Sequence, residues 1–385
     1  MKKLGEKFFY IDTLYGLFIC LLLENDLNKN FYFFSTKLPK KILDNLENKI
    51  VIKERNSIKL VKYIIGAVYF RILKLLFFKR IKDSKFYIHD LGKYSQYFFN
   101  NYTGKFIVVE DGTMNYSYDA LKGEKEKANK KLTFSKKLRK KFVYGIKKFY
   151  PTLGQSEKVK KIILTGILPI PEIIKSKVEV INIEECWNNL TKEKQKEILA
   201  IFNMKIEELE ILKNNSNKIL LLTQPLSEDG IVSEEEKIKM YENILIEKNI
   251  KEIYIKLHPR ERTDYVKNFK NIKVNIIKKD FPAEILFLLN INFNKVITLF
   301  STAALNFKGK SEIEFIGTKD YPKLIERFGI IEQRTENREQ RTENREQRTE
   351  NREQRTENRE QRTENREQRT VNTNIFKSIN KIKIA

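Results

Sequence analysis

Four short segments carry the residue types and spacing that acid–base and anion chemistry require. Two acidic turns, Glu110-Asp111-Gly112-Thr113 and Glu228-Asp229-Gly230, offer carboxylates that can accept a proton. The run Lys256-Leu257-His258-Pro259-Arg260 places one of the chain's two histidines between two cations, and Phe300-Ser301-Thr302 offers hydroxyl groups suited to a phosphate. The set predicts a site with a general base and groups that handle an anion.

Each segment also has an ordinary structural explanation. Asp-Gly pairs are common in surface turns, Ser-Thr pairs cap helices, and a His-Pro pair can lie in a packed loop. The segments gain specificity as a set because each follows an apolar, strand-like run. Open α/β sheets bind ligands at the carboxyl ends of their strands, so we expect the four segments to contribute to one site.

Apolar runs with strand character alternate with helical patterns, which predicts an α/β fold with mostly parallel sheets. The first run, Phe8–Tyr15, is predicted as a strand that leads into a turn, where Asp12 or Thr13 can cap a helix that extends to Leu23. Further strands are predicted at Phe31–Ser35, Phe86–His89, Phe106–Glu110, Ile162–Thr165, Val178–Ile183, Ile219–Thr223, Ile253–Leu257, Val274–Ile277, Val296–Phe300 and Ile313–Ile316, with helices at Ser233–Lys248 and Ala283–Leu289.

The polar stretch from Lys213 to Lys218 breaks this alternation and is the predicted linker. It divides the chain into a first domain of residues 1–213 and a second domain of residues 218–330. Charged heptad repeats fill residues 332–370, and an amphipathic tail of residues 371–385 follows them.

The heptad Glu-Gln-Arg-Thr-Glu-Asn-Arg has no apolar position, so it cannot build a hydrophobic coiled-coil seam. Residues 332–370 hold 11 Arg and 11 Glu, which cancel in charge. We interpret the repeats as a solvated spacer, with electrostatic pairing between chains as the alternative.

Composition limits the class of protein. Hydrophobic residues make up 41% of the chain, which excludes wholesale disorder. Cys20 and Cys186 are too few for a disulfide framework or a cysteine metal cage, and no His, Cys or Asp cluster has metal-ligand spacing. The apolar segment Leu14–Leu23 follows a strand-like run and lacks a cleavage site, so we expect no secretion signal and a cytoplasmic location.

The net charge of +24 is spread over the chain and is dominated by lysine, without a zinc finger or an aromatic RNA-binding motif. We therefore expect no nucleic-acid partner. The segment Ile58–Phe78 is apolar but is interrupted by Lys59, Lys62, Arg71 and Lys74, so it is not a transmembrane span. A core or dimer-contact helix is predicted there, with binding at a membrane surface as the alternative.

Taken in order, these motifs resemble one known family, the bacterial lipooligosaccharide sialyltransferases of glycosyltransferase family 52. The resemblance reaches from the start of the chain to the heptad repeats, and each motif is short while the ordered set is specific. It is carried by Asp12-Thr13-Leu14-Tyr15, Glu110-Asp111-Gly112-Thr113, Leu222-Thr223-Gln224-Pro225, Leu257-His258-Pro259-Arg260, Phe281-Pro282-Ala283-Glu284 and Phe300-Ser301-Thr302-Ala303-Ala304-Leu305.

The resemblance implies a GT-B-like fold of two Rossmann-type domains facing a cleft, to which the heptad repeats are an extension. It implies an inverting, metal-independent transfer of sialic acid from CMP-sialic acid to a terminal sugar of a surface glycolipid, without a cofactor. It further implies a homodimer that exchanges a helical segment, for which residues 58–78 are the candidate. Peripheral contact with the inner face of the cytoplasmic membrane is an additional expectation.

The resemblance also assigns roles. It implies that His258 hydrogen-bonds or protonates the leaving phosphate, that Ser301 and Thr302 donate to its oxygens, and that Glu284 contacts the cytidine. The family's catalytic aspartate maps to Asp229 or Glu228 across a short insertion, whereas Asp111 is the base by analogy with related families. We favour Asp229 because it lies one strand from His258 in the same predicted domain. The other expected substrate-binding residues are Glu110, Gly112, Thr113, Lys256, Pro259 and Arg260.

Two other functions fit parts of the pattern. One is a glycosyltransferase that uses a nucleotide-diphosphate sugar, since a fold does not fix the donor. The other is a basic membrane-binding or nucleic-acid-binding protein in which the acidic motifs are turns. The His258-Pro259 pair and the Phe281-Pro282-Ala283-Glu284 segment favour the CMP donor over the diphosphate donor.

Overall fold

The computed structural model describes residues 7–24, 30–35, 38–52, 85–91, 94–130, 138, 140–142, 145–205, 212–213 and 218–331. Residues 1–329 form one compact unit, and residues 330–385 form another. The segment 58–78, the linker residues 214–217, the heptad repeats 332–370 and the tail 371–385 lie outside the described residues. The two predicted domain ranges, 1–213 and 218–330, stay predictions.

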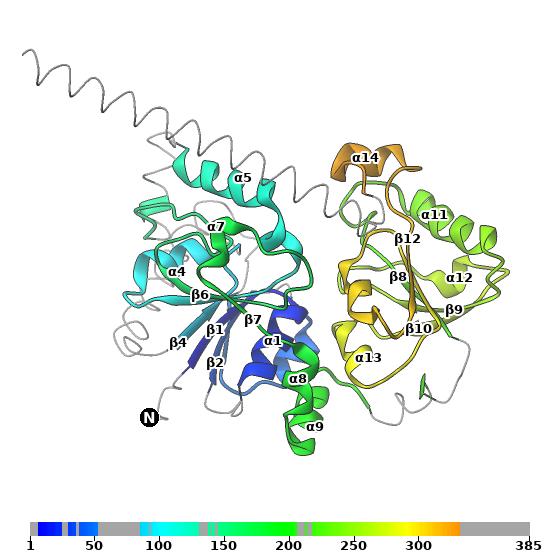
Figure 1. The fold of residues 1–385 in the computed structure, drawn as a ribbon, viewed down its shortest axis with the longest axis horizontal. Coiled ribbons are helices and arrows are strands. Elements are labelled where there is room, and N and C mark those ends of the chain that lie inside the picture. Colours follow the sequence, from blue (N-terminus) through cyan, green and yellow to red (C-terminus); the bar gives the residue numbers. More distant parts are fainter. Residues whose placement is uncertain are drawn as a thin grey trace, which may run out of the picture. The chain divides into compact units, whose positions relative to one another are not determined.

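The first sheet has seven strands, all parallel, in the order β3-β2-β1-β4-β5-β6-β7 (Figure 1). This is a Rossmann-type order, in which the direction of winding reverses between β1 and β4. The prediction of parallel strands is confirmed here, but β3 was not predicted. The strands are β1 (Lys7–Ile11), β2 (Asn30–Ser35), β3 (Lys49–Ile52), β4 (Lys85–Ile88), β5 (Phe106–Val109), β6 (Val159–Leu164) and β7 (Val178–Val180).

The second sheet has five parallel strands in the order β10-β9-β8-β11-β12. Its winding reverses between β8 and β11, so it also has a Rossmann-type order. All five strands were predicted. They are β8 (Ile219–Leu222), β9 (Glu252–Lys256), β10 (Lys273–Ile277), β11 (Lys295–Thr298) and β12 (Glu312–Phe315).

Helices cover both faces of the first sheet, and the alternation of side chains along its strands decides which face each helix covers. Phe8 and Tyr10 of β1 pack with α4, α5 and α7, whereas Phe9 and Ile11 pack with α1, α8 and α9. Thr13 caps α1 by accepting a hydrogen bond from the Gly16 amide at 3.1 Å, as predicted. The helices are α1 (Leu14–Leu23), α2 (Lys40–Asp44), α4 (Ser95–Asn101), α5 (Tyr118–Asn129), α7 (Glu172–Lys175), α8 (Ile183–Asn188) and α9 (Lys192–Ile201).

The second sheet is covered in the same way. Leu221 and Ile297 face α11, α12 and α14, whereas Leu220 and Val296 face α13. The predicted capping box at Ser233 and Glu236 is present, which confirms the start of α11. The helices are α11 (Glu234–Glu247), α12 (Tyr265–Asn268), α13 (Glu284–Leu288) and α14 (Pro322–Phe328).

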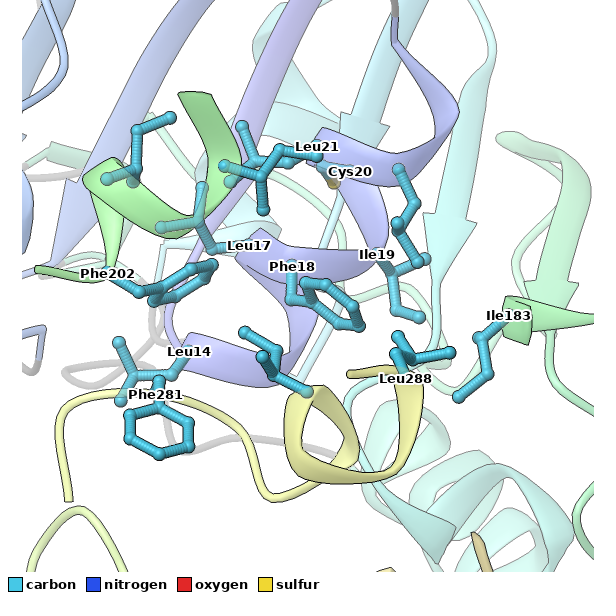
Figure 2. Close-up of a cluster of buried hydrophobic side chains, with 14 of the residues drawn as sticks. Leu14, Leu17, Phe18, Ile19, Cys20, Leu21, Ile183, Phe202, Phe281 and Leu288 are labelled. Carbon is cyan, nitrogen blue, oxygen red and sulfur yellow. The ribbon is translucent and has the colours of Figure 1, made fainter. Parts of the chain in front are cut away.

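One apolar core joins the two sheets. It brings Leu14 and Phe18 of α1 together with Phe281 and with Leu288 of α13 (Figure 2). Helix α1 is almost wholly apolar, so the first sheet alone cannot cover it. The helix that begins beside the first sheet's strand ends therefore packs against the helix that carries Glu284. Among the helices that the described residues form, none is long and apolar enough to cross a bilayer.

We expect this shared core to dominate stability. Ile19 is fully buried in it, whereas Ile246 on α11 is 57% exposed. Ile19→Ala should lower the free energy of unfolding by about 2–5 kcal/mol, because it removes buried methyl groups and leaves a cavity. The matched control Ile246→Ala should change it by about 0.5 kcal/mol or less. Urea unfolding followed by fluorescence measures both, and equal losses would contradict the shared core.

Candidate active site

The first acidic turn follows β5. Gly112 has φ of 105°, in the region that favours glycine, and this lets the chain turn sharply after Asp111. Thr113 then opens a short 3-10 helix, Thr113–Tyr116. The backbone therefore places two consecutive carboxylates at the carboxyl end of a central strand, as the sequence predicted.

Asp111 is held by residues from two neighbouring strands. Its Oδ2 lies 2.8 Å from Nδ1 of His89, which follows β4, and its Oδ1 accepts a hydrogen bond from the Thr13 hydroxyl, which follows β1. Burial alone would lower the pKa of His89, but the charge and hydrogen bond of Asp111, with Asp12 and Asp90 nearby, outweigh it and raise that pKa. His89 is a functional candidate that the sequence analysis missed. Its signal was its place at the end of the predicted strand Phe86–His89.

Glu110 is buried and fully occupied. Its carboxylate accepts hydrogen bonds from the Tyr116 hydroxyl at 2.8 Å, the Thr165 hydroxyl at 2.9 Å and the Tyr15 hydroxyl at 3.3 Å, as well as from the Thr165 amide. Burial raises the pKa of Glu110 even though these bonds favour its charged form. Glu110 thus ties together the ends of β5 and β6 and the first turn of α1.

The two carboxylates of the second acidic turn, Glu228 and Asp229, have different surroundings. Glu228 accepts from Nζ of the fully buried Lys237 at 2.9 Å and from the Arg262 amide at 2.6 Å. Burial alone would raise the pKa of Glu228, but these two bonds outweigh it and lower that pKa. Glu228 is therefore a fixed structural carboxylate, and this leaves Asp229 as the available acid of the turn.

Asp229 forms a two-point ion pair with Arg260. Nη2 of Arg260 lies 3.0 Å from Oδ2 of Asp229, and Nη1 contacts Oδ1. The Arg260 side chain is 57% exposed and that of Asp229 is 33% exposed. Exposed ion pairs of this kind contribute about 0.2–1 kcal/mol, so solvent and ligands can compete for either partner.

His258 follows β9 and is fixed through its backbone and its ring. Its Nδ1 accepts a hydrogen bond from the Arg260 amide at 3.2 Å, so its proton lies on Nε2. Burial and then the charges of Arg260 and Lys256 lower the pKa of His258 to about 4. At neutral pH the ring is therefore an uncharged hydrogen-bond donor. Pro259 lies half-buried between His258 and Arg260.

A fully buried carboxylate, Glu261, holds the loop that follows β9 against the end of β8. It accepts from the His258 amide at 3.2 Å, the Tyr265 hydroxyl at 2.6 Å and the Thr223 hydroxyl. Nζ of Lys237 lies 3.5 Å from Oε1 of Glu261, the oxygen that accepts from Tyr265. The sequence analysis missed Glu261 and Lys237, because charged residues on a turn and on an amphipathic helix carry no signal of burial.

Ser301 and Thr302 follow β11, next to the end of β8. The Ser301 amide donates to Oγ1 of Thr298 at 3.0 Å, and the Thr298 hydroxyl donates to the Leu222 carbonyl at 3.0 Å. Thr302 opens a 3-10 helix, Thr302–Phe307. The predicted helix start is therefore present in 3-10 form, and it leaves both half-buried hydroxyl groups at the strand end.

Lys256 and Glu284 are buried charges that stabilise each other. Burial lowers the pKa of Lys256 and raises that of Glu284, while each one's charge opposes the other's shift. The Glu110 carboxylate raises the pKa of Glu284 further, which places the first acidic turn in electrostatic contact with α13. Nζ of Lys256 lies 4.4 Å from the centre of the Phe281 ring. The repulsion between Glu110 and Glu284 therefore acts between the two sheets at the level of the site.

The structure thus brings three predicted residues together and places a fourth, Asp111, in a second cluster. The first cluster contains Asp229, Arg260 and His258, and the second contains Asp111 with Thr13 and His89. The part of the chain that the structure describes holds no group of three or more His, Cys, Asp or Glu side chains able to bind a metal ion.

Comparison with known proteins identifies the family. Residues 17–320 match the model of glycosyltransferase family 52. An uncharacterised protein from Haemophilus influenzae is 40% identical over 227 residues, which are 59% of this chain and 67% of that protein.

Two solved structures share the fold. An α/β-galactoside α-2,3-sialyltransferase from Photobacterium phosphoreum is 15% identical, covers 80% of this chain and 89% of that one, and has a TM-score of 0.52. A 2,6-sialyltransferase from Photobacterium sp. JT-ISH-224, in a ternary complex with CMP and lactose, is 12% identical, covers 80% and 71%, and has a TM-score of 0.51. The expected GT-B-like fold with two Rossmann-type sheets is confirmed.

The two histidines should titrate far apart. We expect His258 to gain a proton only near pH 4, because burial and two cations oppose the charge, and His89 to gain it above the ordinary value of 6.5, because Asp111 favours the charge. Proton–carbon NMR of the imidazole rings measures both transitions, and His89→Gln assigns them. A His258 ring that titrates at 6.5 or above would contradict the neutral donor.

Proposed function

We propose that this chain, which belongs to glycosyltransferase family 52, is a sialyltransferase that moves sialic acid from CMP-sialic acid to a terminal sugar of a surface glycolipid. The supporting observation is the arrangement of three neighbouring strand ends. The neutral His258 ring follows β9, Asp229 follows the adjacent β8, and the Ser301 and Thr302 hydroxyls follow β11 on the other side of β8. An imidazole and two hydroxyls can stabilise a leaving phosphate, and the carboxylate can accept a proton.

In the proposed reaction the acceptor hydroxyl oxygen attacks the anomeric carbon of sialic acid from the face opposite to CMP. The new carbon–oxygen bond forms as the bond to the phosphate oxygen breaks, so the configuration inverts. Asp229 takes the acceptor's proton, and the electron pair of the broken bond leaves with CMP. Nε2–H of His258 donates to the phosphate, and Ser301 and Thr302 add hydrogen bonds as its negative charge grows.

Residues around the donor's cytidine would come from the buried pair. Glu284 opens α13 and would bind the cytidine, and Asn306 fixes it by donating to Oε1 at 3.3 Å. Burial raises the pKa of Glu284 to about 7, and the charge of Lys256 opposes that rise, so Lys256 favours the ionised carboxylate that can accept hydrogen bonds from ribose hydroxyls. The proposed role of Lys256 is therefore to favour the charged form of Glu284, and the positive potential around the phosphate comes from Arg260.

The first acidic turn would serve the acceptor. Both Asp111 oxygens are taken by Thr13 and His89, so Asp111 is rigid and suits positioning better than proton transfer. We further propose lipooligosaccharide as the acceptor, a homodimer, and peripheral contact with the inner face of the membrane. These rest on the family resemblance and on the basic composition of the chain.

A donor screen tests the proposal. Purified protein is given CMP-sialic acid, UDP-glucose or UDP-galactose, each with and without a lipooligosaccharide acceptor, and released nucleotide is measured with and without EDTA. We expect CMP release that needs the acceptor and survives EDTA, because in the proposed site Arg260, His258, Ser301 and Thr302 would face the phosphate. UDP release that EDTA abolishes and Mg²⁺ restores would support the diphosphate-sugar enzyme instead.

The choice between the two aspartates is a separate prediction. Asp229→Asn should lower transfer by about a hundredfold or more, the usual scale for a general base, while CMP still binds. Asp111→Asn should keep measurable turnover, because the amide can still bond with Thr13 and His89. Initial rates of CMP release and calorimetry with CMP measure the two effects. The reverse pattern would make Asp111 the base and the Glu228-Asp229-Gly230 segment an ordinary turn.

A further inference from the structure

Arg260 occupies both oxygens of the carboxylate proposed as the base. Nη2 contacts Oδ2 of Asp229 at 3.0 Å, and Nη1 contacts Oδ1. A general base needs a lone pair directed at the proton that it removes. In the ligand-free protein, one lone pair on each Asp229 oxygen is therefore engaged by the arginine, whose positive charge also makes the carboxylate a weaker base.

This ion pair differs from the other contacts of the site in its exposure. Glu228 and Glu261 are paired with the fully buried Lys237, and Asp111 is 13% exposed between His89 and Thr13. Arg260 is 57% exposed, and the pair that it forms is the weak, solvent-screened kind. Of these carboxylates, Asp229 has the partner that an anionic ligand can remove most easily.

Arg260 also stands where the leaving phosphate would lie. Its amide donates to Nδ1 of His258, and among the charged groups its guanidinium has the largest effect on the pKa of that ring. A phosphate that accepts a hydrogen bond from Nε2 of His258 would come within reach of the same guanidinium. The planar fork of an arginine binds a phosphate and a carboxylate with the same two-point geometry, so it can exchange one for the other.

We propose that Arg260 exchanges partners when the donor binds. Its guanidinium moves from Asp229 to the donor's phosphate, and this frees Asp229 to act as the base. This rests on the proposed function. The exchange makes Arg260 a specificity-determining residue, because only a ligand with an anion at that position releases Asp229. It also keeps the base engaged until the donor is in place.

Binding and structure with CMP as the probe test this. Arg260→Gln should weaken CMP binding in calorimetry by about tenfold or more, because it removes a charged contact to the phosphate. Binding of cytidine, which lacks the phosphate, should not change. The matched control is Arg262→Gln, which removes the same charge two residues away on an exposed side chain and should change neither. Because Arg260 is exposed, its replacement should not impair folding.

A crystal structure of the wild-type protein with CMP shows the partner directly. We expect the Arg260 guanidinium on the phosphate and both Asp229 oxygens free of it. If Arg260 stays on Asp229, or if Arg260→Gln binds CMP as tightly as wild type does, the exchange is wrong while the sialyltransferase proposal stands. If wild-type protein does not bind CMP, the proposed function itself fails and the exchange fails with it.

Discussion

Helix α1 has no polar face, and the rest of the structure depends on that constraint. In an α/β domain the outer side of a covering helix normally meets water, but eight of the ten residues of α1 are buried. The first sheet can cover only one side of it, so α8, α9 and α13 must cover the others. Thr13, which caps α1, bonds to Asp111, and α13 begins at Glu284. Burying this one apolar helix therefore fixes the proposed acceptor-side residues against the proposed donor-side residues.

Around this apolar contact the protein places charges that are costly to bury. Lys256 and Glu284 offset each other, and Glu110 is satisfied by three hydroxyl groups and an amide. Lys237 and Glu261 are a second buried pair, and that pair holds the loops after β8 and β9. The buried carboxylates have fixed partners and the exposed Asp229 does not. The buried carboxylates therefore hold the shape of the site, whereas the exposed Asp229 is the carboxylate proposed to change its partner.

The features that sequence predicts well here are local ones. Apolar runs gave the strands, turn residues gave their ends, and Ser233 with Glu236 gave the start of α11, because each depends on neighbours within a few residues. Strand β3, Lys49–Ile52, was missed although predicted strands such as β8 are no longer; it lies at the edge of the first sheet, where residues 49–51 are only half-buried. The bond between His89 and Asp111 and the burial of Lys237 depend on which strands and helices become neighbours in space. The contact partners of such residues cannot be predicted from a local sequence pattern until the order of the strands is known.

The packing of α1 on α13 has a consequence for engineering. A chimera could join the proposed acceptor half of this protein to the donor half of another. Its two halves would meet not only at the predicted linker near residue 213 but also where Phe18 packs near Leu288 (Figure 2). A transplanted donor half that lacks a complementary α13 would leave an apolar helix open to water and prone to aggregation. A chimera built on this protein would therefore need α1 and α13 to be transferred as a matched pair.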